Sequence, residues 1–286
     1  MLPVGGRPML ERVVHWLAGH GVDEAILSLG YRPDAFLEAY PGGVCAGVAL
    51  KYVVEDSPLD TAGAIGYAAR TASLTDPFLV VNGDVLTELD VTSLVRFHRD
   101  RSAEATIALT PVDDPSRFGV VPTDETGRVV AFIEKPRPEE APTNLINAGT
   151  YVLEPSVVDR IPEGRRVSIE RETFPQMVAE GRLFAMASDA AWLDAGTPAT
   201  YLAANLDYAD DGVVLGAGVF VDEAATVCGS VIMDGAQIEA GAEVRDSIVG
   251  QKARIGRGCR ILDLTVVGEG FVVEPGTVVS GGRLPG

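Results

Sequence analysis

Basic residues, cysteine and histidine are scarce in this sequence of 286 residues. Its 23 Lys and Arg face 41 Asp and Glu, giving a formal net charge of −18 at pH 7, so the basic surface that nucleic acids require is absent. The three cysteines lie far apart without a Cys-x-x-Cys pair, which fits neither a disulfide framework nor a zinc site. We therefore expect a cytoplasmic protein that does not bind nucleic acid.

Long apolar runs and several catalytic signatures are missing as well. No run approaches the roughly 18 apolar residues of a membrane span, and no signal-peptide pattern opens the sequence, so we expect no membrane partner. No lysine follows a glycine, which excludes a P-loop, and neither HExxH nor GxSxG occurs. An acidic protein can still bind anionic substrates if local cations or a metal ion offset the repulsion.

Up to about residue 210, short apolar runs alternate with helical patterns, which is typical of a mostly parallel sheet covered by helices. The first helix is expected to begin at Pro8 and to stop at the glycines Gly19 and Gly21. The next expected elements are strands at 25–29, 48–54 and 78–81 and helices at 34–40 and 62–72.

Residues 119–135 interrupt this alternation. Two apolar runs flank a turn at 123–127, which predicts an antiparallel hairpin and hence a mixed sheet. Farther on, Thr173 with Gln176 three residues later predicts an N-cap and a helix, and Thr197 followed by Pro198 predicts the start of another.

After Gly212 the sequence becomes repetitive, with one apolar position in every six residues. A six-residue period fits a coil of three flat faces, each turning one side chain inward, and it resembles the hexapeptide-repeat proteins with their left-handed parallel β-helix. Residues 213–286 contain no histidine, which disfavours the acyl transfer that some such proteins catalyse. Twelve positions, enough for about four coils, follow the period with one slip after Val244: Val214, Phe220, Thr226, Ile232, Ile238, Val244, Val249, Ile255, Ile261, Val267, Val273 and Val279.

Two aspartates follow apolar runs in distant parts of the sequence. Asp84 ends Asn82-Gly83-Asp84, and Asp194 precedes the helix expected at Thr197. Ordinary turns explain each of them alone, since Asn-Gly is a common turn pair. Together they could hold Mg²⁺, which favours carboxylate oxygens and substrate phosphates.

Two further short motifs remain ambiguous from residue chemistry alone. Glu134 and Lys135 end a strand just before Pro136, and a solvated ion pair explains them as well as a binding site does. Asn147 and Gly149 interrupt the apolar run 145–153, where either a ligand or a simple β-bulge would require small residues.

Segments in eight places resemble the sugar-nucleotide pyrophosphorylases (nucleotidyltransferases), most closely their mannose-1-phosphate guanylyltransferase branch. The string 170–175, Glu-Arg-Glu-Thr-Phe-Pro, is the most specific sign of that branch. The resemblance implies an α/β, Rossmann-like nucleotidyltransferase domain with a mixed sheet over residues 1–211 and a left-handed parallel β-helix over residues 212–286. The matching segments are 2–10, 55–63, 82–84, 117–121, 134–136, 146–149, 168–175 and 192–198.

The resemblance also assigns residues to a site. It implies that Asp84 and Asp194 bind Mg²⁺ and that Lys135 joins them in catalysis. Asp60 stands where the family usually has glycine, in the loop beside the nucleotide base. The implied substrate-binding positions are Pro58, Leu59, Thr61 and Gly63 in that loop, and Gly119, Glu134, Asn147 and Gly149 around the sugar phosphate.

The implied reaction joins a nucleoside triphosphate to a hexose 1-phosphate and releases pyrophosphate, with GDP-mannose as the first expected product. UTP, dTTP or ATP stay open as alternatives to GTP. The family's Gly-rich GxGTRL segment, which precedes the Leu-Pro-Val motif, does not occur in this sequence, so we expect either a start farther upstream or a truncated, non-catalytic homologue. Self-association through the β-helix is a further expectation.

Overall fold

The computed structural model describes residues 2–30, 33–209 and 211–285. These residues form two compact units, of which unit 1 comprises Leu10–Trp192 and unit 2 combines Leu2–Met9 with Leu193–Gly286. Within the described residues, no helix is long and apolar enough to cross a membrane.

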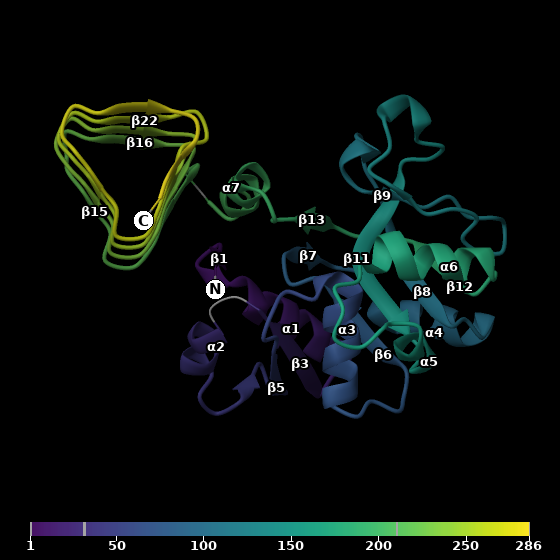
Figure 1. Cartoon of the computed structure of the whole chain (residues 1–286). Helices are drawn as coiled ribbons and strands as arrows, with labels where there is room; N and C mark the ends of the chain where they lie inside the picture. The colour runs from purple at the N-terminus through teal and green to yellow at the C-terminus, as the bar shows by residue number, and fades with distance from the viewer. Residues whose placement is uncertain (1, 31–32, 210, 286) are drawn as a thin grey trace. The chain divides into compact units, whose positions relative to one another are not determined.

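A six-stranded mixed sheet around β11 (Leu145–Leu153) forms the centre of unit 1 (Figure 1). β11 runs antiparallel between β6 (Phe78–Val81) and β8 (Ala105–Pro111), while β12 (Leu183–Ala187) lies parallel to β8. The mixed sheet is confirmed, but the expectation of mostly parallel pairing is wrong for β11. The segment 112–144, which connects β8 to β11, contains no α-helix of the kind that a parallel crossover uses.

The hairpin predicted over residues 119–135 is confirmed. Its strands β9 (Gly119–Val120) and β10 (Ile133–Glu134) pair antiparallel, and β9 also pairs with β11. A separate three-stranded sheet holds the earlier strands of unit 1, namely β3 (Glu24–Leu29), β5 (Val48–Val54) and β4 (Val44–Cys45).

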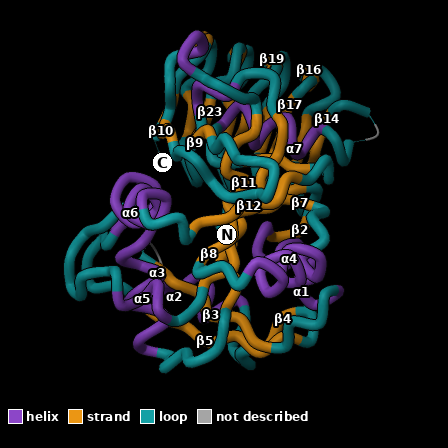
Figure 2. The backbone as a smooth tube through the Cα atoms, turned by 90° about the vertical axis from the view of Figure 1, so that its right-hand side faces the viewer, coloured by secondary structure: helices purple, strands orange, loops and turns teal. Residues whose placement is uncertain are grey.

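Helices cover both faces of the central sheet. In Figure 2, α3, α5 and α6 lie on one side of β8 and β12, and α1 and α4 lie on the other. Tyr151 and Phe174 are fully buried on the first side, and Leu94 is buried on the second. The helices of unit 1 are α1 (Met9–Gly19), α2 (Pro33–Ala39), α3 (Asp60–Thr71), α4 (Val91–Arg101), α5 (Ser156–Asp159) and α6 (Phe174–Ala179).

The start of α6 differs from the prediction. Residues Ile169–Thr173 form a π-helical turn that runs directly into α6, so Thr173 already has helical backbone angles and makes no capping hydrogen bond in the described part of the chain. The prediction of Thr173 as an N-cap is therefore wrong. Ser168 is the capping residue, since its hydroxyl accepts a hydrogen bond from the Arg171 amide at 3.3 Å.

Unit 2 contains three parallel sheets stacked in coils, seen nearly end-on as a triangle in Figure 1. This arrangement is a parallel β-helix, as predicted. The first sheet contains β14 (Val213–Leu215), β17 (Ser230–Ile232), β20 (Ile248–Val249), β23 (Val266–Val267) and β26 (Arg283–Leu284). The other two contain β15 (Phe220–Val221), β18 (Gln237–Ile238), β21 (Arg254–Ile255) and β24 (Val272–Val273), and β16 (Thr226–Cys228), β19 (Glu243–Arg245), β22 (Arg260–Leu262) and β25 (Val278–Ser280).

The strand register confirms the repeat from Ile232 onward and corrects its first coil. Stacked residues such as Ser230 and Ser247 are 17 positions apart. Three six-residue repeats would make a coil of about 18 residues, so counting in sixes displaces the inward position by one residue in such a coil. Phe220, counted as inward, is 56% exposed. The register pairs Leu215, Val221 and Val227 with the inward Ile232, Ile238 and Val244, although Leu215 in this first coil is itself 55% exposed. By that register Val214, Phe220 and Thr226 are wrong as inward positions.

One face of the β-helix is covered within unit 2. The outward side chains Val231 and Ile248 are only 2% and 4% exposed, because α7 (Pro198–Leu206) packs beside β14 and β17. The predicted N-cap of α7 is confirmed, since Thr197 Oγ1 accepts from the Thr200 amide at 3.2 Å. An antiparallel pair, β1 (Pro3–Val4) and β2 (Arg7–Pro8), belongs to the same unit.

Side chains of α7 hold that N-terminal pair in place. Tyr201 Oη donates to the Pro3 carbonyl at 2.6 Å, and the Gly5 amide donates to Asn205 Oδ1 at 3.1 Å. Because Asn205 is fully buried, its side-chain hydrogen bonds to Gly5 and to the Tyr201 carbonyl fix a defined geometry.

Candidate functional site

The turn after β6 is tied to a bulge in β11. The Asn82 amide donates to the Gly149 carbonyl at 2.8 Å, and the turn then presents the exposed residue Asp84 just before β7 (Val85–Thr87). The register of β11 shifts between Asn147 and Tyr151, which confirms a bulge. Gly149 has φ +72°, and a Cβ there would lie 2.8 Å from Asn82 Nδ2, so backbone conformation and close approach both require glycine.

Tyr151 is the buried centre of the candidate site. Its hydroxyl accepts a hydrogen bond from Asn147 Nδ2 at 2.8 Å, while Asn147 Oδ1 accepts from the Gly149 amide at 2.9 Å. Burial raises the pKa of Tyr151, and the charges of Glu170, Glu134 and Asp84 raise it further. The phenol therefore stays neutral under the charges of three carboxylates, and we call Asp84, Glu134 and Glu170 the carboxylate cluster.

Glu134 and Lys135 lie at the end of β10. Lys135 has φ +49°, and its amide donates to the Phe118 carbonyl at 3.0 Å, so the backbone turns sharply here. Burial raises the pKa of Glu134, and the Lys135 charge opposes that shift. Their side chains are 3.8 Å apart and are 24% and 61% exposed, which leaves the ammonium group accessible to an anion.

Gly119 is required by the approach of β10. A Cβ at position 119 would lie 2.6 Å from Phe132 Cζ and 3.2 Å from Glu134 Oε2. A larger residue would displace the Phe132 ring and press on the Glu134 carboxylate.

The loop at 58–63 adopts a conformation that explains Asp60. This residue has φ +64°, a region that glycine occupies readily and aspartate tolerates. Its carboxylate accepts from the Thr61 amide at 2.9 Å and pairs with Arg166 at 3.2 Å. Gly63 is packed tightly, since a Cβ there would lie 2.8 Å from Leu59 Cβ.

Unit 1 brings together most of the residues predicted for the site. Thr61 Oγ1 donates to Glu170 Oε2 at 2.8 Å, which joins the loop at 58–63 to the carboxylate cluster. Pro58 is exposed at the rim of this loop.

Asp194 ends β13 (Trp192–Asp194) in unit 2, where its Oδ1 accepts from the Gly196 amide at 2.7 Å. Its pairing with Asp84 on one metal ion stays a prediction. No group of three or more His, Cys, Asp or Glu able to hold a metal occurs among the described residues. The carboxylate oxygens of Asp84 and Asp194 are nevertheless of the type that Mg²⁺ uses when substrate phosphates and water supply its other ligands.

Two residues of the site had no role in the sequence prediction. Glu170 appeared there only as part of a family motif, and Tyr151 did not appear at all. The four-residue spacing from Asn147 to Tyr151 could have signalled the hydrogen bond only if the bulge between them had been known.

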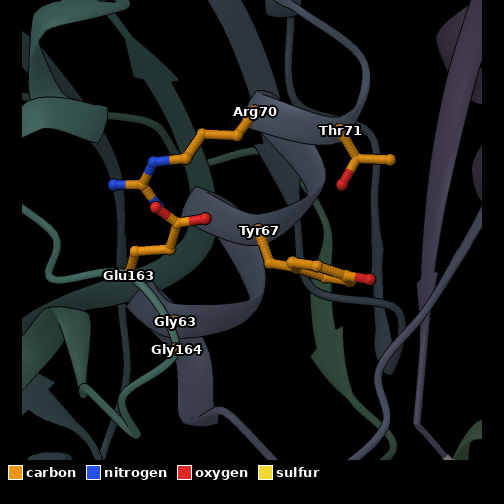
Figure 3. Close-up of a pocket in the computed structure, with 6 residues that line it drawn as sticks. All are labelled: Gly63, Tyr67, Arg70, Thr71, Glu163 and Gly164. Atoms are coloured by element: carbon orange, nitrogen blue, oxygen red, sulfur yellow. The ribbon is translucent and has the colours of Figure 1, made fainter.

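A cavity of about 230 Å³ lies along α3. Figure 3 shows Arg70 and Glu163 pointing toward one another on one side of it and the ring of Tyr67 on another. Arg70 Nη2 also donates to the carbonyls of Val158 and Ile161. The lining residues are Gly63, Tyr67, Arg70, Thr71, Glu163 and Gly164, of which Gly63 alone was predicted as a site residue.

The sequence was also compared with models of known protein families. Residues 1–211 match the sequence model of the nucleotidyl transferases. The chain belongs to the nucleotidyl transferase family. Residues 208–284 of this nucleotidyl transferase match a second model, the GMPPB C-terminal domain, which covers the β-helix.

Individual relatives of this nucleotidyl transferase are consistent with both matches. It is 39% identical to a mannose-1-phosphate guanylyltransferase of Mycobacterium tuberculosis over 98% of this chain and 76% of that protein. A mannose-1-phosphate guanyltransferase of Yarrowia lipolytica is 32% identical over 99% of this chain and 89% of its own length. The crystal structure of HddC from Yersinia pseudotuberculosis complexed with GMP-PN superimposes with a TM-score of 0.63 and 29% identity, over 73% of this chain and 89% of that one.

Proposed function

We propose that this chain transfers a guanylyl group from GTP to mannose 1-phosphate and releases pyrophosphate. The observation that carries the proposal is the arrangement around Tyr151, whose hydroxyl bonds to Asn147 and whose pKa is raised by the charges of the carboxylate cluster, with Lys135 beside Glu134. Relatives named as mannose-1-phosphate guanylyltransferases support the choice of nucleotide and sugar, and so does the neighbouring structure complexed with GMP-PN.

The proposed roles follow from the chemistry of each group. Lys135 neutralises the phosphate of the sugar, because its ammonium is accessible and lies on a sharply turned backbone. Glu134 and Asn147 form hydrogen bonds with sugar hydroxyls, since a carboxylate accepts and an amide both donates and accepts. Gly119 leaves room for the Glu134 carboxylate, and the Gly149 amide fixes Asn147 by donating to its Oδ1 at 2.9 Å.

In the reaction itself, an oxygen of the sugar phosphate forms a bond to the α-phosphorus of GTP. The bond between the α-phosphorus and the bridging oxygen breaks, and pyrophosphate leaves with that electron pair. The work of the protein is positioning and charge neutralisation, so no covalent nucleophile is needed. Asp84 and Asp194 would hold Mg²⁺, which when bound offsets the negative charge of the phosphates.

The test is a substrate matrix with the purified chain and Mg²⁺. GTP, UTP, dTTP and ATP are each combined with mannose 1-phosphate and glucose 1-phosphate, and pyrophosphate release is measured. We expect GTP with mannose 1-phosphate to give the highest kcat/KM. A preference for another pair would correct the substrate, and absence of turnover with every pair would favour the non-catalytic homologue over the enzyme.

A further inference from the structure

Glu170 links two segments that are far apart in the sequence. The proposed reaction assigns no role to it, although it belongs to the family motif at 170–175. Its Oε2 accepts hydrogen bonds from Thr61 Oγ1 at 2.8 Å and from Ser168 Oγ at 2.7 Å. Hydrogen bonds to a charged acceptor are about twice as strong as neutral ones. The hydrogen bond to Thr61 spans 109 positions of sequence, so it joins segments that no hydrogen bond within one helix or turn could join.

Further hydrogen bonds run along the same line. Val167 exchanges backbone hydrogen bonds with the loop. The Thr61 hydroxyl acts both as acceptor and as donor, because it accepts from the Ile169 amide and donates to Glu170. We call this set the loop seam. Its backbone donors and acceptors are Val167 N to Leu59 O at 2.9 Å, Ala62 N and Gly63 N to Val167 O at 2.9 and 3.1 Å, and Ile169 N to Thr61 Oγ1 at 2.8 Å.

The loop seam holds a strained start of α3. Asp60 has φ +64° directly before Thr61, a conformation that costs an L-residue about 1 kcal/mol or more and persists only where the surroundings fix it. Thr61 N bonds back to the Asp60 carboxylate, but Arg166, the partner of Asp60 across the seam, is itself exposed. The half-buried hydrogen bond between Thr61 and Glu170 is therefore better shielded from water than that ion pair.

Glu170 also acts on other residues of the candidate site. Its charge raises the pKa of Tyr151 and of Glu134, which places it within electrostatic range of both. One side chain therefore bonds to the loop and also acts electrostatically on Tyr151 and Glu134.

We propose that Glu170 is a positioning residue that latches the loop at 58–63 in its nucleotide-binding conformation through the Thr61 hydroxyl. The inference rests on the proposed function, because it takes that loop as the one beside the nucleotide. Without the latch the loop relaxes away from the strained conformation at Asp60, and the nucleotide must reorder it on binding. If the fraction of molecules with a binding-competent loop falls, the apparent affinity for the nucleotide falls by the same factor. The chemical step after binding is unchanged.

The experiment compares five variants with the wild type in the full chain, namely two single variants of the latch, their double variant, a conservative variant and a control. Glu170→Ala and Thr61→Val remove either end of the latch, and Thr61→Ser retains the hydroxyl. The matched control is Thr126→Val, which removes a hydroxyl bonded to Asp124 at 2.6 Å in an exposed turn of the β9–β10 hairpin. Two quantities are measured, namely GTP binding and kinetics, and amide hydrogen exchange of residues 59–63.

We expect Glu170→Ala and Thr61→Val each to raise the KM and Kd for GTP about tenfold, the loss of one charge-assisted hydrogen bond, with kcat within about twofold of the wild type. The double variant should lose no more than either single one, because both remove the same contact. Exchange at residues 59–63 should accelerate in these variants, whereas Thr61→Ser, which retains the hydroxyl, should keep the exchange rate of the wild type. The control Thr126→Val should match the wild type in both measurements. Thr61 and Glu170 lie outside the buried core of unit 1, and Thr61→Val keeps the test valid if Glu170→Ala folds poorly.

Other outcomes separate the latch from the proposed function. If the wild type binds GTP and both latch variants bind it equally well, the latch is wrong and the function stands. Unchanged exchange at residues 59–63 overturns the latch in the same way. If the wild type binds none of the four nucleotides, the proposed function fails and the latch fails with it.

Discussion

Replacing Gly149 by alanine tests whether the bulge in β11 positions the turn that carries Asp84. Alanine at φ +72° costs about 1 kcal/mol in backbone strain. Its Cβ would also lie 2.8 Å from Asn82 Nδ2 and 3.0 Å from Asn82 Cγ, and relieving such a contact costs about 1–3 kcal/mol more. We therefore expect Gly149→Ala to destabilise unit 1 by about 2–4 kcal/mol.

Gly164→Ala is the matched control for the backbone term. Gly164 has φ +66°, but a Cβ there would meet none of the described atoms within 4 Å, so only the strain of about 1 kcal/mol remains. Urea unfolding followed by tryptophan fluorescence is the appropriate assay, because both tryptophans, Trp16 and Trp192, lie in unit 1.

We expect kcat/KM to fall where the new Cβ contacts Asn82 and not where it adds backbone strain alone. A displaced Asn82 moves the turn that carries Asp84, so Gly149→Ala should lower kcat/KM by about tenfold or more. Gly164→Ala should leave kcat/KM near the wild-type value. Equal losses of stability in the two variants, within about 0.5 kcal/mol, would refute the argument that the Asn82 contact requires glycine.

Three other predictions address the metal, an ion pair and the repeat. Asp84→Asn should abolish Mg²⁺-dependent pyrophosphate release without changing the urea midpoint, and near-normal turnover would rule out the metal role. Arg160 holds the pKa of Glu104 below its usual value, so Arg160→Ala should cost about 3 kcal/mol at pH 7 in urea unfolding. That loss should shrink as pH falls through the range where Glu104 protonates, because the pair stabilises only the ionised carboxylate, and a pH-independent loss would contradict the argument. Ile255→Ala, in the fully buried core of the β-helix, should cost about 3 kcal/mol when unfolding is followed by circular dichroism, and a loss below about 1 kcal/mol would argue against an inward position.

The sequence patterns predicted local structure well and pairing between distant segments poorly. The hairpin over residues 119–135 was predictable because both of its strands flank one turn. The antiparallel placement of β11 was not, since its partners β6 and β8 are chosen by packing across the whole of unit 1. Thr173 failed for a related reason, because a preceding π-helical turn already supplied the helix that it was expected to begin.

The repeat shows how a small error of register arises. Several inward positions have an apolar residue directly before them in the sequence. Val214 and Leu215 therefore fit a six-residue period about equally well. Stacking against Ile232 decides between them, and stacking is a contact between coils that no single coil encodes.

Family resemblance predicted the parts of the candidate site but not the contacts that join them. Asn147, Gly149 and Glu134 were singled out from the sequence, whereas the central position of Tyr151 depends on a bulge. The hydrogen bond of Thr61 to Glu170 crosses 109 positions, a distance over which a single sequence gives no pairing signal.

The composition of unit 2 has a consequence for synthesis of the protein. Pro3 and Gly5 are translated early, but their partners Tyr201 and Asn205 follow 198 and 200 positions later. At translation rates of roughly 5–20 residues per second, the N-terminal strands wait about 10–40 seconds for these partners. Unit 1 can therefore fold on the ribosome from a continuous segment, whereas unit 2 closes only after the chain has emerged well beyond α7. The earliest residues of this sequence are thus among the last to reach their native contacts.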